Sequence, residues 1–70
     1  MQWIEPNEVD WRKLFDDDQT IVIVVRRGEI SDVVCGHVSM MNNRNELELE
    51  SLHQGHFGFY DYEVEKVLIL

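Results

Sequence analysis

Apolar and polar residues alternate along much of the chain after residue 20, and this period-two pattern predicts β-strands. Residues 46–50 read Glu-Leu-Glu-Leu-Glu, which points both leucines toward a core and all three carboxylates toward solvent. Residues 20–25 are β-branched throughout, so we expect a strand there that is buried on both faces. Residues 33–41 resume the apolar character, and Gly36 inside this strand indicates a bulge or a sharp bend.

The remaining segments of the second half fit short strands joined by tight turns. We expect an exposed connection at 26–29, a hairpin turn at 42–45, a loop at 51–55, a strand at 56–60, one helical turn at 62–66 and a terminal strand at 67–70. In the strand at 56–60 we assign Phe57 and Phe59 to the core, with Tyr60 and Tyr62 at its rim.

Before the strands, residues 7–16 carry a helical pattern. Asn7 is the expected N-cap, and Trp11, Leu14 and Phe15 follow at helical spacing, so one face of the helix should pack on the core. Three adjacent aspartates at residues 16–18 oppose the helix dipole and end the helix. Trp3 lies outside this pattern.

These elements predict an α+β fold that is mostly β. We expect residues 1–70 to form a single domain, with a helix at 7–16 and the β region at 20–70. The order of elements favours a five-stranded antiparallel SH3-like or Sm-like small barrel, or a curled sheet. A helix beside an ordinary β-meander is the alternative.

The β region resembles the YolD-like family of small bacterial and prophage proteins. The parts that carry the resemblance are the β-rich run Ile21 to Val25, then Gly36-His37-Val38, Asn42 to Asn45, Glu46 to Glu50, and Val64-Glu65-Lys66-Val67. The chain is shorter at the front and more acidic than that family. The resemblance implies association with Y-family DNA-damage polymerases and no catalytic residues. In its short length and its acidity the chain is also similar to phage-encoded inhibitors of host defence.

Charge narrows the range of partners. Six Lys and Arg against fourteen Asp and Glu give a formal net charge of −8, which repels nucleic-acid phosphates and attracts a basic protein surface. We therefore expect no direct nucleic-acid binding. We expect no membrane contact either, because no signal peptide or spanning apolar run is present. Cys35 is the only cysteine, and a lone thiol among apolar neighbours favours the cytoplasm.

The residue types that carry chemistry are few and poorly spaced. Cys35, His37, His53 and His56 are potential zinc ligands, but a buried thiol and loop histidines account for them better. His53 or His56 beside Asp61 or Glu63 would form an acid–base pair, yet no nucleophile accompanies it. We expect no metal, no cofactor and no enzymatic activity.

The acidic residues are the best candidates for a binding site, because a row of carboxylates along a strand roughly follows the spacing of phosphates. The expected partner-binding residues are Asp16, Asp17, Asp18, Glu46, Glu48 and Glu50, with Tyr60 and Tyr62 as an aromatic rim. Alternatively, these charges form a solvated face that protects a sheet edge.

These observations predict a small acidic protein-binding module of bacterial or phage origin. It would assist or inhibit a basic protein that handles nucleic acid. One alternative is a self-assembling Sm-like structural domain, in which residues 67–70 pair with the open edge of a neighbour. The other is a single-strand nucleic-acid binder that stacks bases on its aromatic residues.

Overall fold

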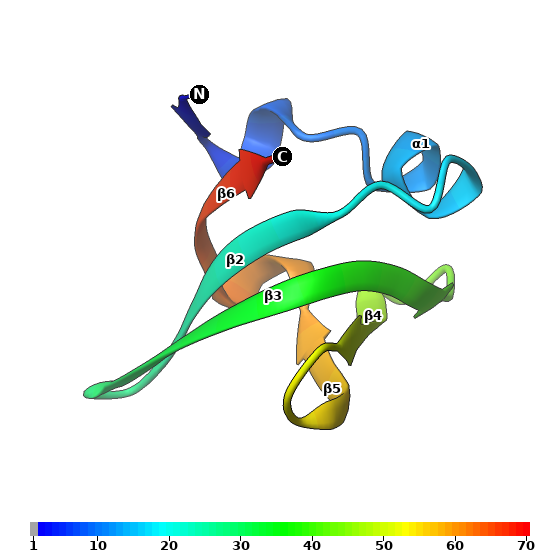
Figure 1. The fold of residues 1–70 in the computed structure, drawn as a ribbon. Helices are drawn as coiled ribbons and strands as arrows, with labels where there is room; N and C mark the ends of the chain where they lie inside the picture. The colour runs from blue at the N-terminus through cyan, green and yellow to red at the C-terminus, as the bar shows by residue number, and fades with distance from the viewer. Residues whose placement is uncertain (1) are drawn as a thin grey trace.

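The computed structural model describes residues 2–70, which form a short helix and an antiparallel sheet (Figure 1). The elements are β1 (Trp3–Ile4), the three-ten helix η1 (Pro6–Glu8), α1 (Trp11–Asp16), β2 (Ile21–Arg27), β3 (Ile30–Met41), β4 (Glu46–Ser51), β5 (Gly55–Tyr60), the three-ten helix η2 (Asp61–Glu63) and β6 (Val64–Ile69). Within residues 2–70 the sheet has six strands in the order β1-β6-β2-β3-β4-β5. The prediction of a mostly β protein with a short N-terminal helix is confirmed.

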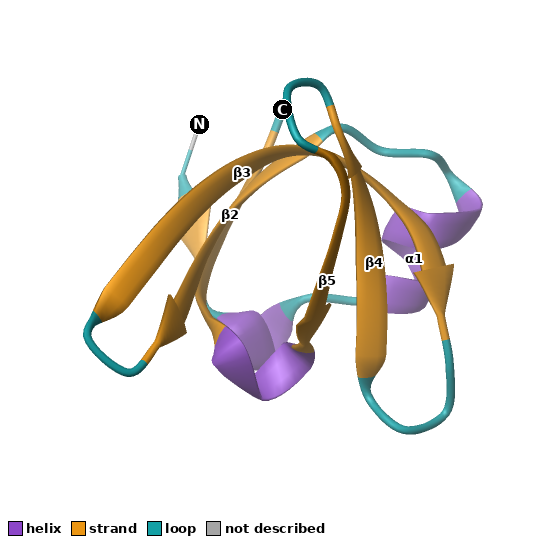
Figure 2. Ribbon diagram, turned by 90° about the horizontal axis from the view of Figure 1, so that it is seen from below, coloured by secondary structure: helices purple, strands orange, loops and turns teal. Residues whose placement is uncertain are grey.

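The sheet curls because the long strand β3 changes partners along its length (Figure 2). Its first half pairs with β2 and its second half with β4, and Gly36 lies in both ladders, opposite Ile21 and Ser51. A Cβ on Gly36 would overlap the backbone carbonyl of Glu50, so only glycine fits where the strands cross. A register shift between Val38 and Met40 adds a further bend. The bulge or bend predicted at Gly36 falls where β3 changes partners, and the register shift itself lies further along the strand, between Val38 and Met40.

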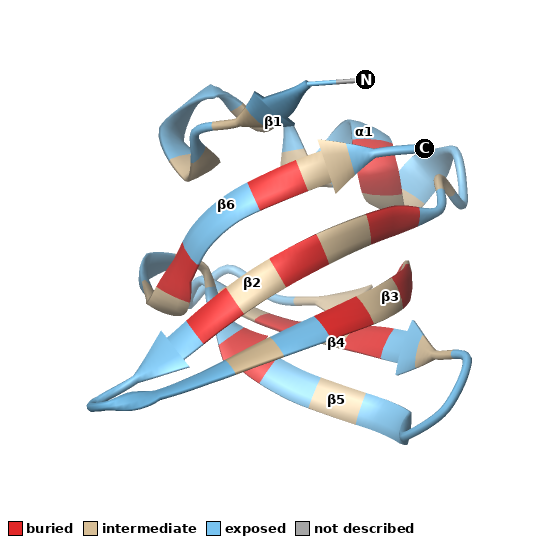
Figure 3. Ribbon diagram, turned by 60° about the vertical axis from the view of Figure 1, so that its left-hand side comes forward, coloured by how far each residue is buried: buried red, intermediate tan, exposed pale blue. Residues whose placement is uncertain are grey.

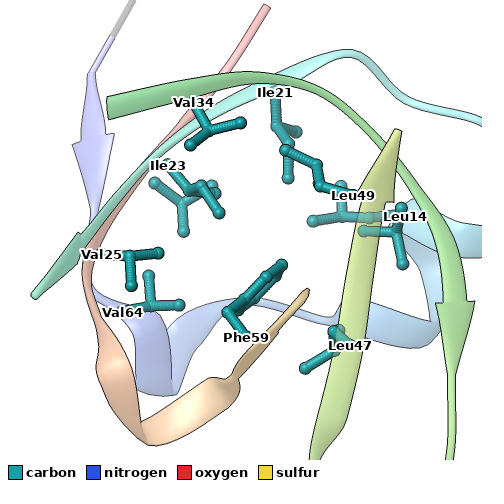
Figure 4. Close-up of a cluster of buried hydrophobic side chains, with 11 residues drawn as sticks. Leu14, Ile21, Ile23, Val25, Val34, Leu47, Leu49, Phe59 and Val64 are labelled. Atoms are coloured by element: carbon teal, nitrogen blue, oxygen red, sulfur yellow. The ribbon is translucent and has the colours of Figure 1, made fainter. Parts of the chain in front are cut away.

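The curl does not close into a barrel within residues 2–70, because the outer edge of β5 pairs with no other described strand. The sheet therefore takes the curled form of the prediction rather than the closed form. The core fills the inside of the curl (Figure 4). Its buried side chains are Leu14, Ile21, Ile23, Val25, Val34, Val38, Leu47, Leu49, Phe59, Val64 and Val67. Phe59 is a core residue as predicted, whereas Phe57 is half-buried at the margin.

The predicted helix at 7–16 is wrong in its first half. Residues 6–8 form the separate three-ten turn η1, and Val9 is extended, which interrupts the helix. The N-cap of α1 is Asp10 rather than Asn7, because its side chain accepts a hydrogen bond of 3.1 Å from the backbone N–H of Lys13. Leu14 is buried as expected, and Trp11 lies half-buried with its ring 5.8 Å from that of Phe59.

Strand β2 is buried on one face only, which corrects the expectation of two buried faces. Alternate residues from Ile21 to Val25 point into the core, whereas Val22 and Val24 are half-exposed on the outside (Figure 3). The strand also continues through Arg26 and Arg27, so the predicted connection at 26–29 shortens to a turn at residues 28–29. Strand β3 accordingly begins at Ile30, three residues earlier than predicted.

In the C-terminal part the elements begin and end at other residues than predicted. The helical turn predicted at 62–66 is η2 at residues 61–63, and β6 already starts at Val64. Two residues before η1 also form the unpredicted strand β1, in which Trp3 pairs with Leu68 of β6. The hairpin turn at 42–45 is confirmed, because Asn45 has a φ of 64° and the N–H of Asn42 donates to the carbonyl of Glu46.

Candidate protein-binding surface

The outer surface of β4, with the adjoining parts of β3 and β5, carries three carboxylates and is called the acidic face below. Glu46, Glu48 and Glu50 lie on the side of β4 opposite to the buried Leu47 and Leu49. The structure therefore brings these three predicted binding residues together on one surface. Glu50 is exposed, whereas Glu46 and Glu48 are half-buried, so the row is less open than the alternation alone suggests.

Two histidines flank the carboxylate row and were not predicted as part of this surface. His56 Nδ1 lies 2.7 Å from Glu48 Oε1, and His37 Nε2 lies 3.3 Å from Glu50 Oε2. A protonated imidazole at either position would offset one carboxylate charge. The cross-strand register that places His37 and His56 on either side of Glu50 was the missing signal, because neighbouring strands share a face pair by pair.

The same histidines are potential zinc ligands together with Cys35 and His53. In residues 2–70 no three His, Cys, Asp or Glu side chains come close enough together to hold a metal ion. Cys35 is half-buried on β3, and His53 is exposed in the turn between β4 and β5. Cys35 and His37 share β3, whereas His53 lies in that turn and His56 on β5, so the structure does not bring the four residues together.

A hollow of about 490 Å³ interrupts the acidic face at Gly58. Arg27, Met40, Glu48 and Tyr60 are among the residues that line it. A Cβ built on Gly58 would meet no other described atom within 4 Å, so the missing side chain leaves open space. The hollow can receive a long basic side chain, because its stem would lie on apolar surface and its charged head near carboxylates.

Arg27 covers part of the outer edge of β5. Its guanidinium donates to the carbonyl of Gly58 and lies 3.0 Å from Glu63 Oε2, and it stands 5.0 Å from the centre of the Phe57 ring. The N–H of Tyr60 donates to Glu63 Oε1 at 2.8 Å. This hydrogen bond, and then the nearby Arg27, hold the pKa of Glu63 below its usual value. Two backbone groups of the edge are therefore bonded, which protects this part from pairing with another strand.

Tyr60 and Tyr62 form a stacked pair at the end of the acidic face. Their ring centres are 5.1 Å apart at an angle of 16°, and Tyr62 is 76% exposed. The negative charge of Glu46, followed by the neighbouring phenol of Tyr62, raises the pKa of Tyr60, so the Tyr60 phenol keeps its proton. The predicted aromatic rim is thus an exposed aromatic surface beside a carboxylate, which suits a cation better than a phosphate.

The second predicted acidic cluster lies elsewhere. Asp16, Asp17 and Asp18 are exposed on α1 and the turn after it, not on the outer surface of β3, β4 and β5. Asp16 forms an ion pair of 3.3 Å with Arg12, and Asp18 has a φ of 49°. The two acidic clusters therefore form separate surfaces.

Comparison of the chain with family models, with curated proteins and with solved structures finds no match. The resemblance to the YolD-like family therefore stays a prediction. No helix within residues 2–70 has both the length and the apolar character needed to cross a membrane.

Proposed function

We propose that this chain is a small protein-binding module that docks its acidic face on a basic surface of a protein partner. The single observation that carries the proposal is the carboxylate row of Glu46, Glu48 and Glu50 on one strand of that face. Residues two apart on a strand are separated by about 7 Å, so the row presents regularly spaced negative charge. The net charge of −8 adds a field that draws a basic partner toward the chain.

The regular spacing of these carboxylates indicates the class of partner. A protein that handles nucleic acid has a basic groove that accepts spaced phosphates, and a rigid carboxylate row can occupy the same groove. The module would then inhibit the partner, or assist it from a site that the nucleic acid leaves free. The proposed Y-family polymerase association and the proposed cytoplasmic location both fit this function.

The proposal includes an SH3-like or Sm-like relationship for the fold. Its support is the meander from β2 to β5 followed by β6, which returns through η2 to lie beside β2. The strong bend at Gly36 is the second support, because small barrels need such a corner.

Two alternatives are less well supported. An Sm-like ring through the terminal strand needs an open edge on β6, but β1 pairs with this edge at Val67 and Leu68. Single-strand binding needs cations beside the stacked tyrosines, but Glu46 and Glu63 lie beside them and repel phosphates.

The test is capture of partners from the source lysate with a matched pair of triple variants. Changing Glu46, Glu48 and Glu50 to Gln removes three charges from the acidic face. Changing residues 16–18 from Asp to Asn removes three charges from the other cluster, and Asn tolerates the positive φ of Asp18. We expect the Gln variant to lose the partner and the Asn variant to keep it. Equal loss with both would show an effect of net charge alone and contradict a specific face.

The captured protein is then purified and titrated at two salt concentrations. Wild-type binding should weaken with salt, and duplex DNA should compete with it. Gly58→Val tests the hollow without changing charge, because the new side chain fills open space on an extended strand. We expect at least tenfold weaker binding with no loss of thermal stability. Unchanged binding would exclude the hollow from the interface.

A further inference from the structure

The sheet has a second outer surface whose character is opposite to that of the acidic face. It covers β1, β6, β2 and the first half of β3, and is called the apolar face below. Its side chains are Trp3, Val22, Val24, Val33, Cys35 and Leu68. The strand register aligns Trp3, Leu68, Val22 and Cys35 in one row, and Val24 and Val33 in the next. In Figure 3 these strands show exposed and half-buried segments between the buried ones.

No element of residues 2–70 covers this face. Its side chains are therefore open to solvent, and Val33 is 65% and Trp3 45% exposed. The largest contiguous apolar patch on a small soluble protein is often functional. The charges differ from the rest of the surface as well. Lys66 lies on this face with its Nζ 4.7 Å from the centre of the Trp3 ring, and Arg26 forms an ion pair of 3.4 Å with Glu65 at one end.

We propose that two copies of this chain pair through the apolar face. Two chains of charge −8 repel each other wherever their carboxylates meet, but on this face the carboxylate of Glu65 is already paired with Arg26. A basic partner, in contrast, is drawn to the acidic face. The face therefore suits a second copy better than it suits a cationic protein.

The positions of the charges define the arrangement of the pair. Arg26 and Glu65 stand on the neighbouring strands β2 and β6 at the same end of the face. A twofold axis that runs parallel to the strands between β2 and β6 places Arg26 of each copy over Glu65 of the other. The same axis places Trp3 of one copy over Cys35 of the other, since these residues are at opposite ends of one row.

The apolar face is small, and this limits the affinity of the dimer. Four strands about 4.8 Å apart and some five residues long cover roughly 300 Å². A standard interface buries about 800 Å² on each partner. We therefore expect a dimer that forms with a dissociation constant in the micromolar range or above, rather than a permanent one. It differs from the Sm-like ring, because it uses the face of the sheet and not a strand edge.

The first test is sedimentation of the whole chain over a concentration series, with the matched variants Val24→Lys and Ile30→Lys. Val24 is central to the apolar face, whereas Ile30 is 67% exposed near the β2–β3 turn and outside the face. We expect Val24→Lys to raise the dissociation constant about 100-fold, tenfold for each of the two lysines, and Ile30→Lys to leave it unchanged. A wild type that stays monomeric up to about 1 mM would overturn the proposal.

A charge swap tests the arrangement itself. Arg26→Glu places carboxylates against Glu65 of the other copy and should weaken the dimer, and the double variant Arg26→Glu with Glu65→Arg should restore it. The ion pair within one chain is exposed and contributes little to folding, so thermal stability should hardly change. A dimer that resists Val24→Lys, or a double variant that fails to recover, would overturn the proposed face or its axis.

Discussion

Replacing Gly36 with alanine tests how the sheet curls. The new Cβ would overlap the backbone carbonyl of Glu50, so relief requires β4 to move away from β3 rather than a side chain to rotate. One extra methyl group in a packed site costs about 1–3 kcal/mol, and a backbone neighbour places this change at the upper end. At 0.05–0.15 kcal/mol per residue, a chain of this size has roughly 4–10 kcal/mol in total. We expect Gly36→Ala to cost about 3 kcal/mol, which is roughly 30–75% of that total.

Gly58→Ala is the matched control. Gly58 also lies within a strand, but its Cβ would meet no other described atom within 4 Å and its φ is not positive. Alanine restricts the unfolded chain at such a site and stabilises the folded state by about 0.4–1 kcal/mol. The two variants add the same methyl group and should change stability in opposite directions.

Thermal unfolding followed by far-UV circular dichroism distinguishes these outcomes. For a domain of this size 1 kcal/mol corresponds to about 4–8 °C, so Gly36→Ala should lower the melting temperature by roughly 10–25 °C and Gly58→Ala should raise it by a few degrees. Urea titrations with equal slopes would show that both variants unfold from a similar structure. If both glycine variants melt like the wild type, the close approach of Glu50 to Gly36 does not hold the bend.

Two further predictions concern stability. Trp11→Ala should cost about 2–4 kcal/mol, because the half-buried ring packs on Phe59, whereas Trp3→Ala should cost less than about 1 kcal/mol; melting temperatures that fall equally would contradict this ranking. The lowered pKa of Glu63 contributes stability that is fully present above its usual value of 4.5 and is lost as the pH falls through the lower folded value. The melting-temperature difference between wild type and Glu63→Gln should therefore shrink below pH 4.5, and a constant difference would argue against the hydrogen bond from Tyr60.

The parts of the fold that could be predicted depend on short-range signals. The alternation in β4 and the β-branched run of β2 place Leu47, Leu49, Ile21 and Ile23 in the core, and these side chains are all buried. The bend in β3 was visible too, because a glycine within an apolar strand commonly marks a bulge or the close approach of another backbone.

The parts that could not be predicted depend on contacts between distant segments. Strand β1 has only two residues, which are too few to show an alternation of apolar and polar positions. It forms because its residues pair with the edge of β6. Val22 and Val24 looked like core residues because propensity does not tell whether another layer covers a strand. The histidine partners of the carboxylate row likewise follow from strand register, which links residues up to thirteen positions apart, as His37 and Glu50 are.

The two proposed interactions are compatible because the bend at Gly36 separates them. The apolar face ends in the first half of β3, and the acidic face begins beyond the bend, where β3 pairs with β4. Pairing of two copies therefore leaves both carboxylate rows free, and a dimer presents two acidic faces. On a partner with repeated basic sites the second contact becomes intramolecular, which can raise the overall affinity by about 10²–10⁴-fold without any new contact. A weak dimer then suffices, because a basic array that binds two copies side by side raises their local concentration at the apolar face as well.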